Sequence, residues 1–499
     1  MTGHDGAGVS RRSALKAIGL GAAAAAVAGA SVWAAVAARS PDAARIDVQG
    51  WAGDRGTRYH IAHRGSGDVL PEHSMPAYWA AVEWGARCLE ISVCMTSDGV
   101  LFCMHDPTYD RTSTGRGRSI DQPSSVLDTI RIWQPQLGAA WTREPPRVPL
   151  FEDVLRAYGG RVVLAVEAKV TEAFEPMMAM VARYGLRDSV IVKAHHACRQ
   201  VARAQSAGYP VFCYLGAASE ATSRVITTTA ARLNPQRDYL VIPAFHGGAA
   251  PFVADSVVTA AVDTGVPVWV YPLHRRSDAD HFFALGVQGA ICSSYRYIAG
   301  VIPAATADSW ATQAIAAGEM TKDPASNVYA PEFSSTGELT LAARGVQHFI
   351  TLGQIGPLTT ASGHYAIDVD LAWRTPPTSS TDNVSIAFGR ADDSYYEHRG
   401  GRGDGYHATL RADGKLGLYR HHDGEVAGEP VGSPVDTPPA QPGRWAHLRI
   451  DVSAGRIVLA RTDAGATITA PRTAAADGYA HLGRSSPDGE AVFRALSIT

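Results

Sequence analysis

Side chains able to move protons and bind anions recur at the ends of apolar runs in the first half of the sequence. They are His63, Arg64, Glu90, Ser92, His105, Glu167 and Lys169. Two imidazoles can divide the base and acid roles needed to displace an alkoxide. Carboxylates are the ligands that hard cations prefer, and guanidinium and ammonium groups suit phosphate oxygens. The set therefore predicts phosphoryl chemistry on a small anion.

These residues can meet only if regular elements bring them to one place. From Tyr59 to about Ile302, short β-branched runs alternate with stretches of helical length and periodicity. The candidate strands begin near Tyr59, Arg87, Arg161, Ser189, Tyr209, Asp238, Val266 and Val287. Alternating strands and helices predict parallel strands. Eight repeats predict a closed TIM-type (β/α)8 barrel, with its chemistry at the carboxyl ends of the strands.

Strand alternation places several of the polar side chains on a common face. Glu90, Ser92 and Cys94 share one face of the second strand. Glu167 and Lys169 share one face of the third strand if that strand continues so far. We therefore expect both carboxylates to converge on one mouth of the barrel.

A hairpin should carry His105 to the same mouth. Too few residues separate the run ending at Met95 from the run beginning at Leu101 for a parallel crossover, so the two runs should pair antiparallel. With the turn centred between residues 98 and 99, His105 lies opposite Ser92 and returns to the level of the second strand.

The same register places Cys94 opposite Cys103. In an exported protein this pair could form a disulfide, and two buried thiols are the equally open alternative. No two of the six cysteines have CxxC spacing, so a zinc module is not expected.

The motifs occur in an order that resembles a known family. The order here is HR, ExS, HD and ExK, beginning at His63, Glu90, His105 and Glu167. It resembles the glycerophosphodiester phosphodiesterases, whose pattern is HR, ExD, HD and a later ExK. The resemblance covers residues 59 to about 300. It implies a TIM barrel that hydrolyses glycerophosphodiesters to glycerol phosphate and an alcohol.

The resemblance also implies a role for each matching residue. The expected roles are catalytic for His63 and His105, phosphate-binding for Arg64 and Lys169, and cation-binding for Glu90 and Glu167. The cation would be Ca²⁺ or Mg²⁺, and which histidine is the base stays open. The substrate would be a small phosphodiester, with glycerophosphocholine, a teichoic-acid fragment and a lysophospholipid all suiting the site. Relatives of the family cleave phospholipid head groups by internal attack.

Two residues need separate treatment. Ser92 stands where the family has the Asp of ExD, so it completes the expected metal ligands with a neutral hydroxyl and should bind the cation more weakly. Trp269 matches the family's tryptophan strand and is expected to wall the substrate pocket, with a place in the barrel core as the alternative. Order and spacing assign no role in the site to Glu72, His73, Lys193 or His196.

The amino-terminal segment has the pattern of an export signal. The twin arginine Arg11-Arg12 precedes an uncharged run over 17–38, as in a Tat-type signal, and Ala35-Val36-Ala37 supplies a small-x-small cleavage site. A retained membrane anchor is the alternative, because the run is long enough to span a bilayer. We therefore expect an extracellular or cell-envelope protein.

The carboxyl-terminal part has a different pattern. Over residues 329–499 helical periodicity disappears, and alternating strands separated by Gly, Pro and Asp turns predict an all-β sandwich. The stretch 443–459 resembles concanavalin-like and laminin-G-like jelly rolls. The predicted organisation is a signal at 1–40, a linker at 41–58, the barrel at 59–303, a second linker at 304–328 and the sandwich at 329–499.

Two other functions stay open. The loss of the Asp at position 92 is compatible with a degenerate barrel that binds a phosphodiester or lipid head group without turnover, although binding alone does not require the pair His63 and His105. The sandwich could instead bind polysaccharide on a cell-surface protein whose barrel is a spacer. The formal net charge of −3 over 499 residues argues against a nucleic-acid partner bound through a broad basic surface.

Overall fold

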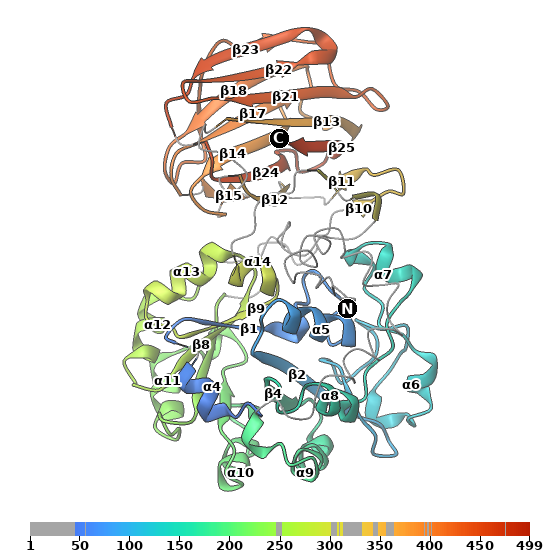
Figure 1. Cartoon of the computed structure of the whole chain (residues 1–499), viewed down its shortest axis with the longest axis vertical. Coiled ribbons are helices and arrows are strands. Elements are labelled where there is room, and N and C mark those ends of the chain that lie inside the picture. Colours follow the sequence, from blue (N-terminus) through green and yellow to red (C-terminus); the bar gives the residue numbers. More distant parts are fainter. Residues whose placement is uncertain are drawn as a thin grey trace, which may run out of the picture.

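The computed structural model has a barrel domain and an all-β domain (Figure 1). It describes residues 45–54, 56–245, 252–300, 307–308, 310–312, 332–342, 348–355, 364–393, 395–396, 399–400, 402–474 and 476–499. The predicted signal at 1–40 and most of the predicted linker at 304–328 lie outside the described residues.

Eight parallel strands form the barrel, in the order β1-β9-β8-β7-β6-β5-β4-β2, and pairing of β1 with β2 closes it. The strands are β1 Tyr59–Ala62, β2 Cys88–Met95, β4 Val163–Ala168, β5 Val190–His195, β6 Val211–Tyr214, β7 Tyr239–Pro243, β8 Val268–Leu273 and β9 Gly289–Cys292. The predicted (β/α)8 barrel is confirmed. Each strand begins within a few residues of its predicted start.

Helices surround the barrel (Figure 1). They are α5 Met75–Glu83, α8 Phe151–Tyr158, α9 Phe174–Arg183, α10 Gln200–Ser206, α11 Ser223–Ala230, α12 Asp255–Val262, α13 Arg276–Ala284 and α14 Tyr295–Ala299. Short helices in the connections are η2 His63–Gly65, η3 Ser119–Asp121, α6 Val126–Thr129, η4 Pro135–Leu137, α7 Ala140–Arg143, η5 Thr171–Ala173, η6 Arg187–Ser189 and η7 Ala218–Glu220. Ser74 caps α5, because its hydroxyl accepts from the Ala77 N–H at 3.2 Å.

A helix closes the end of the barrel where the strands begin, in a segment that was predicted to be a linker. This helix, α4 Val48–Asp54, buries Trp51 beside Tyr59 and Trp269. Trp269 is fully buried, with its ring centroid 5.7 Å from that of Tyr59 and 6.0 Å from that of Trp51. The expected pocket wall at Trp269 is therefore wrong, and the alternative of a core tryptophan holds.

The predicted hairpin exists, but its register differs by one residue. Strand β3, Leu101–Cys103, pairs antiparallel with β2, and Cys103 lies opposite Val93 rather than Cys94. The turn has three residues between Thr96 and Val100, with Gly99 at a φ of +85°, whereas a turn centred between residues 98 and 99 was expected. A shift of one residue moves a side chain to the other face of the sheet.

The shift removes the basis for the disulfide hypothesis. Cys103 packs into the core between the barrel and its helices, and Cys94 packs under the loop that follows β3. All six cysteines are free thiols, and five of them are buried.

The carboxyl-terminal domain packs two antiparallel sheets around a shared core. One sheet has the order β10-β11-β25-β13-β21-β22-β23. The other has the order β12-β24-β14-β17-β18-β19, with β20 also pairing with β18. The strands of the first are β10 Glu332–Phe333, β11 Leu339–Leu341, β13 Tyr365–Thr375, β21 Ala446–Val452, β22 Arg456–Arg461, β23 Ala466–Pro471 and β25 Glu490–Ile498.

The strands of the second sheet are β12 His348–Gln354, β14 Asn383–Arg390, β17 Gly405–Arg411, β18 Lys415–His421, β19 Gly428–Pro430, β20 Val435–Asp436 and β24 Tyr479–Arg484. A small hairpin pairs β15 Tyr395–Tyr396 with β16 Arg399–Gly400, and short helices lie at η8 Trp310–Thr312 and η10 Thr462–Ala464. The predicted all-β domain is confirmed as a sandwich of antiparallel sheets. Its likeness to concanavalin-like jelly rolls stays a prediction.

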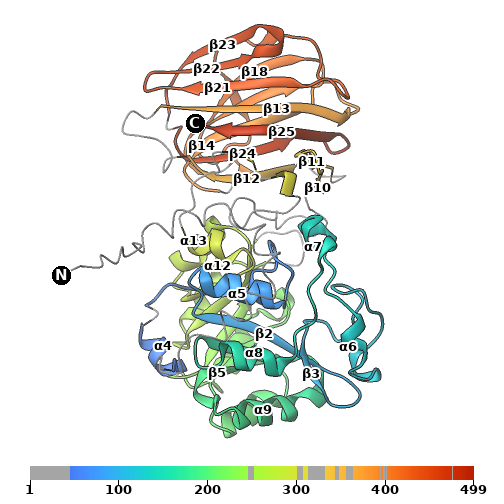
Figure 2. The same cartoon turned by 45° about the vertical axis from the view of Figure 1, so that its right-hand side comes forward.

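The sandwich stacks against the barrel beside α13 and α7, as both views show (Figures 1 and 2). Asp393 from the sandwich is fully buried and accepts from the first N–H groups of α13, Arg276 and Ser277, each at 2.9 Å. It also accepts from the Tyr297 hydroxyl at 2.7 Å. A carboxylate at the N-terminus of a helix is stabilising, so Asp393 fastens the two domains together.

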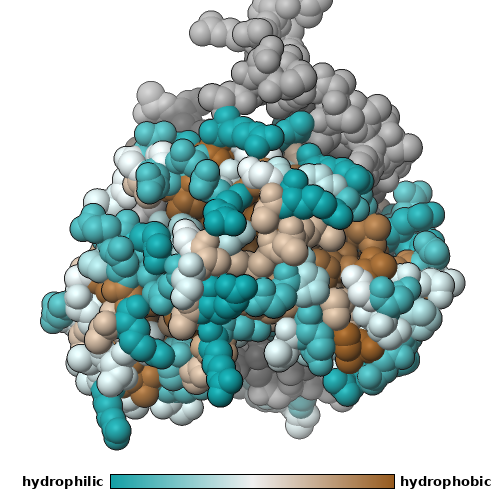
Figure 3. All heavy atoms as spheres, turned by 90° about the horizontal axis from the view of Figure 1, so that it is seen from below, coloured by the Kyte–Doolittle hydropathy of each residue, from teal (hydrophilic) through white to brown (hydrophobic). Residues whose placement is uncertain are grey.

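The surface away from the sandwich is mixed in character. Seen from below, hydrophobic residues lie in small patches separated by hydrophilic ones (Figure 3). Within the described part of the chain, none of the helices is both long and apolar enough for a membrane span.

Candidate active site

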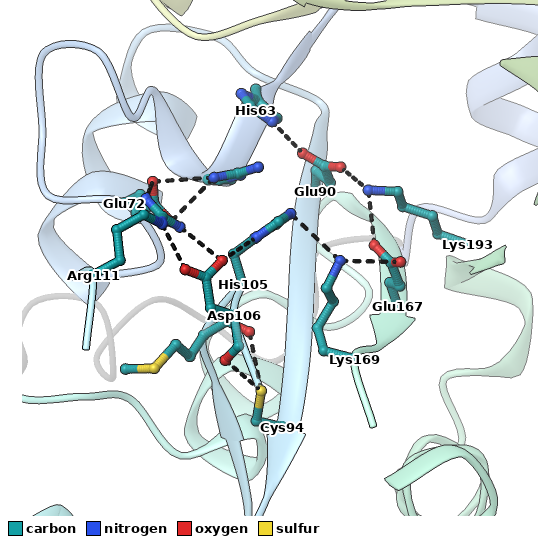
Figure 4. A network of polar contacts seen from close by, with 12 residues as sticks. His63, Glu72, Glu90, Cys94, His105, Asp106, Arg111, Glu167, Lys169 and Lys193 are labelled. Atoms are coloured by element: carbon teal, nitrogen blue, oxygen red, sulfur yellow. Dashed lines mark hydrogen bonds and ion pairs between the residues drawn. The ribbon is translucent and has the colours of Figure 1, made fainter. Parts of the chain in front are cut away.

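The polar centre lies directly above the apolar interior of the barrel. Alternate residues of each strand face inward, and the lower ones, such as Ile61, Ala165 and Ile191, form the buried inner core. The next inward positions are polar: His63 after β1, Glu90 on β2, Glu167 on β4 and Lys193 on β5. These side chains converge at the carboxyl ends of the strands (Figure 4), where TIM barrels carry their chemistry.

Lys193 lies between the two carboxylates. Its ammonium contacts Glu90 Oε1 and lies 2.8 Å from Glu167 Oε2, and the residue is 6% exposed. Burial alone would raise the pKa of both carboxyls, but Lys193 is the largest of the charges that hold both pKa values below normal, to about 2 for Glu167. Burial would lower the pKa of Lys193, but the two carboxylates raise it. All three groups are therefore charged at neutral pH.

His63 closes one end of this arrangement. Its Nε2 lies 3.5 Å from Glu90 Oε2, and its Nδ1 lies 2.7 Å from the Ser293 hydroxyl. Burial, which outweighs the attraction of Glu90, lowers the pKa of His63 to about 3. The imidazole is therefore neutral at neutral pH, with one nitrogen at the carboxylate.

His105 closes the other end. Its Nδ1 lies 2.6 Å from Asp106 Oδ1, and its Nε2 lies 3.4 Å from the ammonium of Lys169. Lys169 in turn pairs with Glu167 Oε1 at 3.2 Å. Burial lowers the pKa of His105, while the hydrogen bond to Asp106 opposes this shift. Asp106 therefore fixes the orientation of the ring and leaves Nε2 toward the centre.

A second ionic cluster lies beside the first and is linked to it through Asp106. Arg64 donates to both oxygens of buried Glu72 at 3.2 Å. Arg111, from the long connection after β3, pairs with Glu72 at 2.8 Å and with Asp106 at 2.6 Å. The chain of contacts from His63 through the lysines and His105 thus continues through Asp106 and Arg111 to Glu72 (Figure 4).

The backbone at this point is held in unusual conformations. Arg64, Ser66 and His73 have positive φ values of 53°, 80° and 54°. Gly65, at φ +77°, could not carry a side chain, because a Cβ there would lie 2.9 Å from the Cβ of Ala77. Strained residues persist only where the surroundings fix them, and they cluster at functional sites.

Ser92 lies on the same face of β2 as Glu90, one inward position closer to the mouth. It pairs in register with Glu167 and is 1% exposed. Its hydroxyl oxygen is buried and has no hydrogen-bond partner within the structure. A buried hydroxyl without a partner is costly, so this group is available to a ligand.

The structure brings together His63, Glu90, Ser92, His105, Glu167 and Lys169 as predicted, with Arg64 beside them in its pair with Glu72. It adds Lys193, Asp106, Arg111 and Glu72, none of which was among the predicted site residues. For Lys193 a signal existed, because a lysine at an inward position interrupts the apolar run of β5.

Aromatic side chains near the centre come from positions other than the predicted one. The Tyr214 hydroxyl donates to Glu167 Oε1 at 2.7 Å. Tyr271 follows Trp269 by two residues on β8, so it faces the same interior one level closer to the mouth, and its hydroxyl donates to the Leu215 carbonyl at 2.5 Å. These tyrosines occupy the level that was expected for Trp269.

Comparison with known proteins gives the same assignment as the motifs. Residues 63–294, which span nearly the whole barrel, match the sequence model of the glycerophosphoryl diester phosphodiesterase family. Over these residues the barrel is similar to this family. The family match ends before the sandwich begins.

Individual relatives of this family match to different extents. The chain is 25% identical over 239 residues to a glycerophosphodiester phosphodiesterase of Caldanaerobacter subterraneus subsp. tengcongensis, covering 46% of this chain and 92% of that protein. It is 45% identical over 69 residues to a probable glycerophosphodiester phosphodiesterase 1 of Mycobacterium tuberculosis, covering 13% of this chain but only 25% of that protein. A crystal structure of a glycerophosphodiester phosphodiesterase from Agrobacterium tumefaciens aligns with a TM-score of 0.39 and 21% identity, over 49% of this chain and 100% of that one.

The resemblance to the glycerophosphoryl diester phosphodiesterase family implies a divalent cation, and the predicted ligands are Glu90, Glu167 and Ser92. The two carboxylates are present, but the ammonium of Lys193 lies between them. The third ligand is a neutral hydroxyl. Hard cations require several free oxygen ligands, so the donor set in this arrangement does not fit a divalent ion.

A different group of side chains nearby could hold a metal ion. His195, His196 and Glu220 place one ligand atom each within 4.8 Å of one another. In the structure they pair among themselves, with Nε2 of the two histidines 3.0 Å and 3.5 Å from Glu220 Oε2. Hydrogen bonding between the imidazoles and the Glu220 carboxylate explains this group without an ion.

Proposed function

We propose that the chain is an exported phosphoric diester hydrolase that cleaves glycerophosphodiesters, or related phospholipid or teichoic-acid phosphodiesters, to glycerol phosphate and an alcohol. The observation that carries the proposal is the placement of His63 and His105 at the two ends of one ionic chain, Glu90–Lys193–Glu167–Lys169. Simple binding of an anion does not require two oriented imidazoles, whereas acid and base catalysis does.

The chemistry is an in-line displacement at phosphorus. One histidine takes a proton from water or from a neighbouring substrate hydroxyl, and that oxygen forms a bond to phosphorus. Attack by water gives glycerol phosphate directly, whereas attack by the hydroxyl gives a cyclic phosphate that a second step with water must open. The bond from phosphorus to the departing alcohol oxygen breaks, and the other histidine gives this oxygen a proton. The two rings exchange protonation states, so protons balance over the step.

Charge on the phosphoryl oxygens is met by cationic side chains. Lys169 lies at His105 and is held by Glu167, while Arg64 is held at the mouth by Glu72. Fixed charges of this kind stabilise charge that develops in the transition state. A bound phosphodiester anion also favours the protonated form of a neighbouring imidazole, which offsets the low pKa that burial imposes on both histidines.

Export is part of the proposal. The twin arginine and apolar run support passage through a Tat-type system, with the barrel and sandwich in the cell envelope or outside the cell. Polysaccharide contact through the sandwich is a further proposal, supported only by the resemblance of 443–459 to jelly rolls. The fastening of α13 by Asp393 supports a bracing role for the sandwich instead.

A second candidate is a receptor that binds the phosphodiester without cleaving it. The observation in its favour is Ser92, which stands in place of an acid. Both candidates predict binding, so turnover separates them.

The test is hydrolysis of a glycerophosphodiester panel by the full chain, with and without added Ca²⁺ or Mg²⁺. We expect release of glycerol phosphate, lost in His63→Ala and His105→Ala. Binding with no turnover in any condition would favour the receptor. An isolated sandwich that binds a glycan array, beside an inert barrel, would favour the cell-surface alternative.

A further inference from the structure

The residue that the family resemblance did not assign is the one at the geometric centre of the site. Lys193 contacts Glu90 and Glu167, which the resemblance treats as ligands of a divalent ion. We propose that the ammonium of Lys193 takes the place of that ion, so that the barrel cleaves phosphodiesters without a metal. The inference rests on the proposed function and adds to it the identity of the central cation.

The position of Lys193 is fixed by the fold. It follows Ile191 on the inward face of β5, beside Glu167 on the neighbouring strand β4, because Val166 and Val192 are partners in the parallel register. Its ammonium lies over the aromatic rings of Phe212 and Tyr214, with Nζ 5.3 Å and 5.0 Å from their centroids. Such a side chain cannot swing into solvent without losing buried contacts.

The carboxylate oxygens are already engaged by the protein. Glu90 has Lys193 at Oε1 and His63 at Oε2, and Glu167 has Lys169 and the Tyr214 hydroxyl at Oε1. The remaining oxygen, Glu167 Oε2, faces Lys193. A divalent ion would have to displace an ammonium that two buried charges hold in place.

Charge balance leads to the same conclusion. Glu90 and Glu167 contribute two negative charges, and Lys193 and Lys169 contribute two positive charges. The family motif supplies a third negative charge at the position of Ser92, and the serine is neutral. A divalent ion added to this set would leave two buried positive charges without counterions, which is unfavourable in a low-dielectric site.

Lys193 can also do what a bound cation does for phosphate. An ammonium has three N–H donors; one donates to Glu90 Oε1, and Glu167 Oε2 is an ion-pair partner at 2.8 Å. A further N–H can donate to a phosphoryl oxygen. The buried Ser92 hydroxyl, which has no partner in the structure, supplies a second donor at the same level. Together they provide preorganised stabilisation of a developing oxyanion.

The test measures ion binding and turnover separately on the full chain treated with EDTA. We expect no divalent ion at this site by Mn²⁺ electron paramagnetic resonance, and glycerophosphocholine hydrolysis that EDTA does not reduce. Lys193→Met should lower turnover by about 10²- to 10³-fold, whereas Lys193→Arg should retain part of it. Thermal melting of both variants shows whether a loss of turnover reflects a loss of folding.

A double variant should replace the Lys193 ammonium with a divalent ion again. Ser92→Asp with Lys193→Gln restores the third carboxylate and removes the ammonium, so it should bind Mn²⁺ and depend on an added ion for any turnover. Glu220→Gln, made in each background, removes a ligand of the His195, His196 and Glu220 group and so identifies any ion bound there.

The possible results separate the two proposals. If EDTA abolishes wild-type turnover, and Ca²⁺ or Mg²⁺ restores it with one ion lost in Glu90→Gln, the role of Lys193 is overturned. If no turnover occurs in any condition, the proposed function fails. The Mn²⁺ titration then still shows whether Lys193 takes the place of the ion. Binding to the wild type that Glu90→Gln removes contradicts the inference, and binding only to the double variant supports it.

Discussion

Lys193 on β5 and Glu167 on β4 are side by side across two parallel strands, with Nζ 2.8 Å from Oε2. The same ammonium contacts Glu90 on β2, so three strands of the barrel meet at one nitrogen. A buried ion that loses its partner costs about 3–5 kcal/mol. The lysine therefore serves the stability of the barrel mouth as well as the proposed chemistry.

The two histidines should have separable roles. His63→Ala and His105→Ala should each lower turnover of glycerophosphocholine by about 10²- to 10⁴-fold. The leaving group of a p-nitrophenyl phosphodiester departs without a proton. On this substrate the variant that lacks the acid should regain turnover, and the variant that lacks the base should not. Steady-state kinetics of both substrates measure this.

The control for the histidine variants is His60→Gln. His60 lies on β1, but its ring packs against Phe283 on α13, outside the barrel interior. His60→Gln should leave the ratio of the turnover rates on the two substrates unchanged. Equal defects of both alanine variants on both substrates would contradict a division into acid and base.

Asp106 should act as a positioning residue for His105. Its carboxylate accepts from His105 Nδ1 at 2.6 Å and opposes the lowering of the His105 pKa by burial. Asp106→Asn should therefore lower the pKa of His105 further and reduce kcat by at least about tenfold, because the ring loses its fixed tautomer. An NMR titration of the His105 ring, with Asp110→Asn as the control, would show an unchanged pKa if Asp106 had no such role.

Asp393 should contribute strongly to stability. It is buried and accepts from two N–H groups at the start of α13 and from the Tyr297 hydroxyl. Asp393→Ala should cost about 2–4 kcal/mol in urea unfolding, because it removes a helix cap and leaves buried donors unpaired. Asp436→Ala, at an exposed ion pair with Lys415, should cost at most about 1 kcal/mol. Equal costs would refute the bracing role.

Stability should fall with acid before the carboxylates titrate. Burial lowers the pKa of His63 and of His481 to about 3, from 6.5 in the unfolded chain. Below pH 6.5 the unfolded chain binds protons that the folded chain excludes, so each histidine reduces stability by roughly 1.4 kcal/mol per pH unit. Glu167, whose folded pKa is about 2, adds a loss only below its ordinary value of 4.5.

Chemical unfolding at pH 7, 6 and 5 measures this effect. His481→Gln should reduce the slope, because it removes one group that the unfolded chain protonates. A free energy of unfolding that stays constant from pH 7 to pH 5 would contradict neutral burial of these histidines.

The sequence was sufficient for the barrel and for most of the site because both follow from strand periodicity. The eight apolar runs determine the strands, and the same alternation places Glu90 and Glu167 inward, above the core. Lys193 also faces inward by this alternation. It was missed because a single lysine in a strand has no motif partner, and only the folded register places it between two acids from other strands.

Other details depended on packing that the sequence pattern does not contain. The turn at Gly99 holds one residue more than expected, which reversed the face of Cys103. Arg111 reaches Glu72 only because the long connection after β3 folds back over the mouth. Trp269 packs in the core beside Trp51, which lies on a helix in a segment expected to be a linker.

The central claim is tested most directly by ³¹P NMR of glycerophosphocholine incubated with the full chain in excess EDTA. We expect the phosphodiester resonance to be replaced by that of glycerol phosphate with the wild type, and to stay unchanged over the same time with His63→Ala and Lys193→Met. A phosphodiester signal that persists in EDTA but disappears when Ca²⁺ or Mg²⁺ is added would contradict a site whose cation is Lys193.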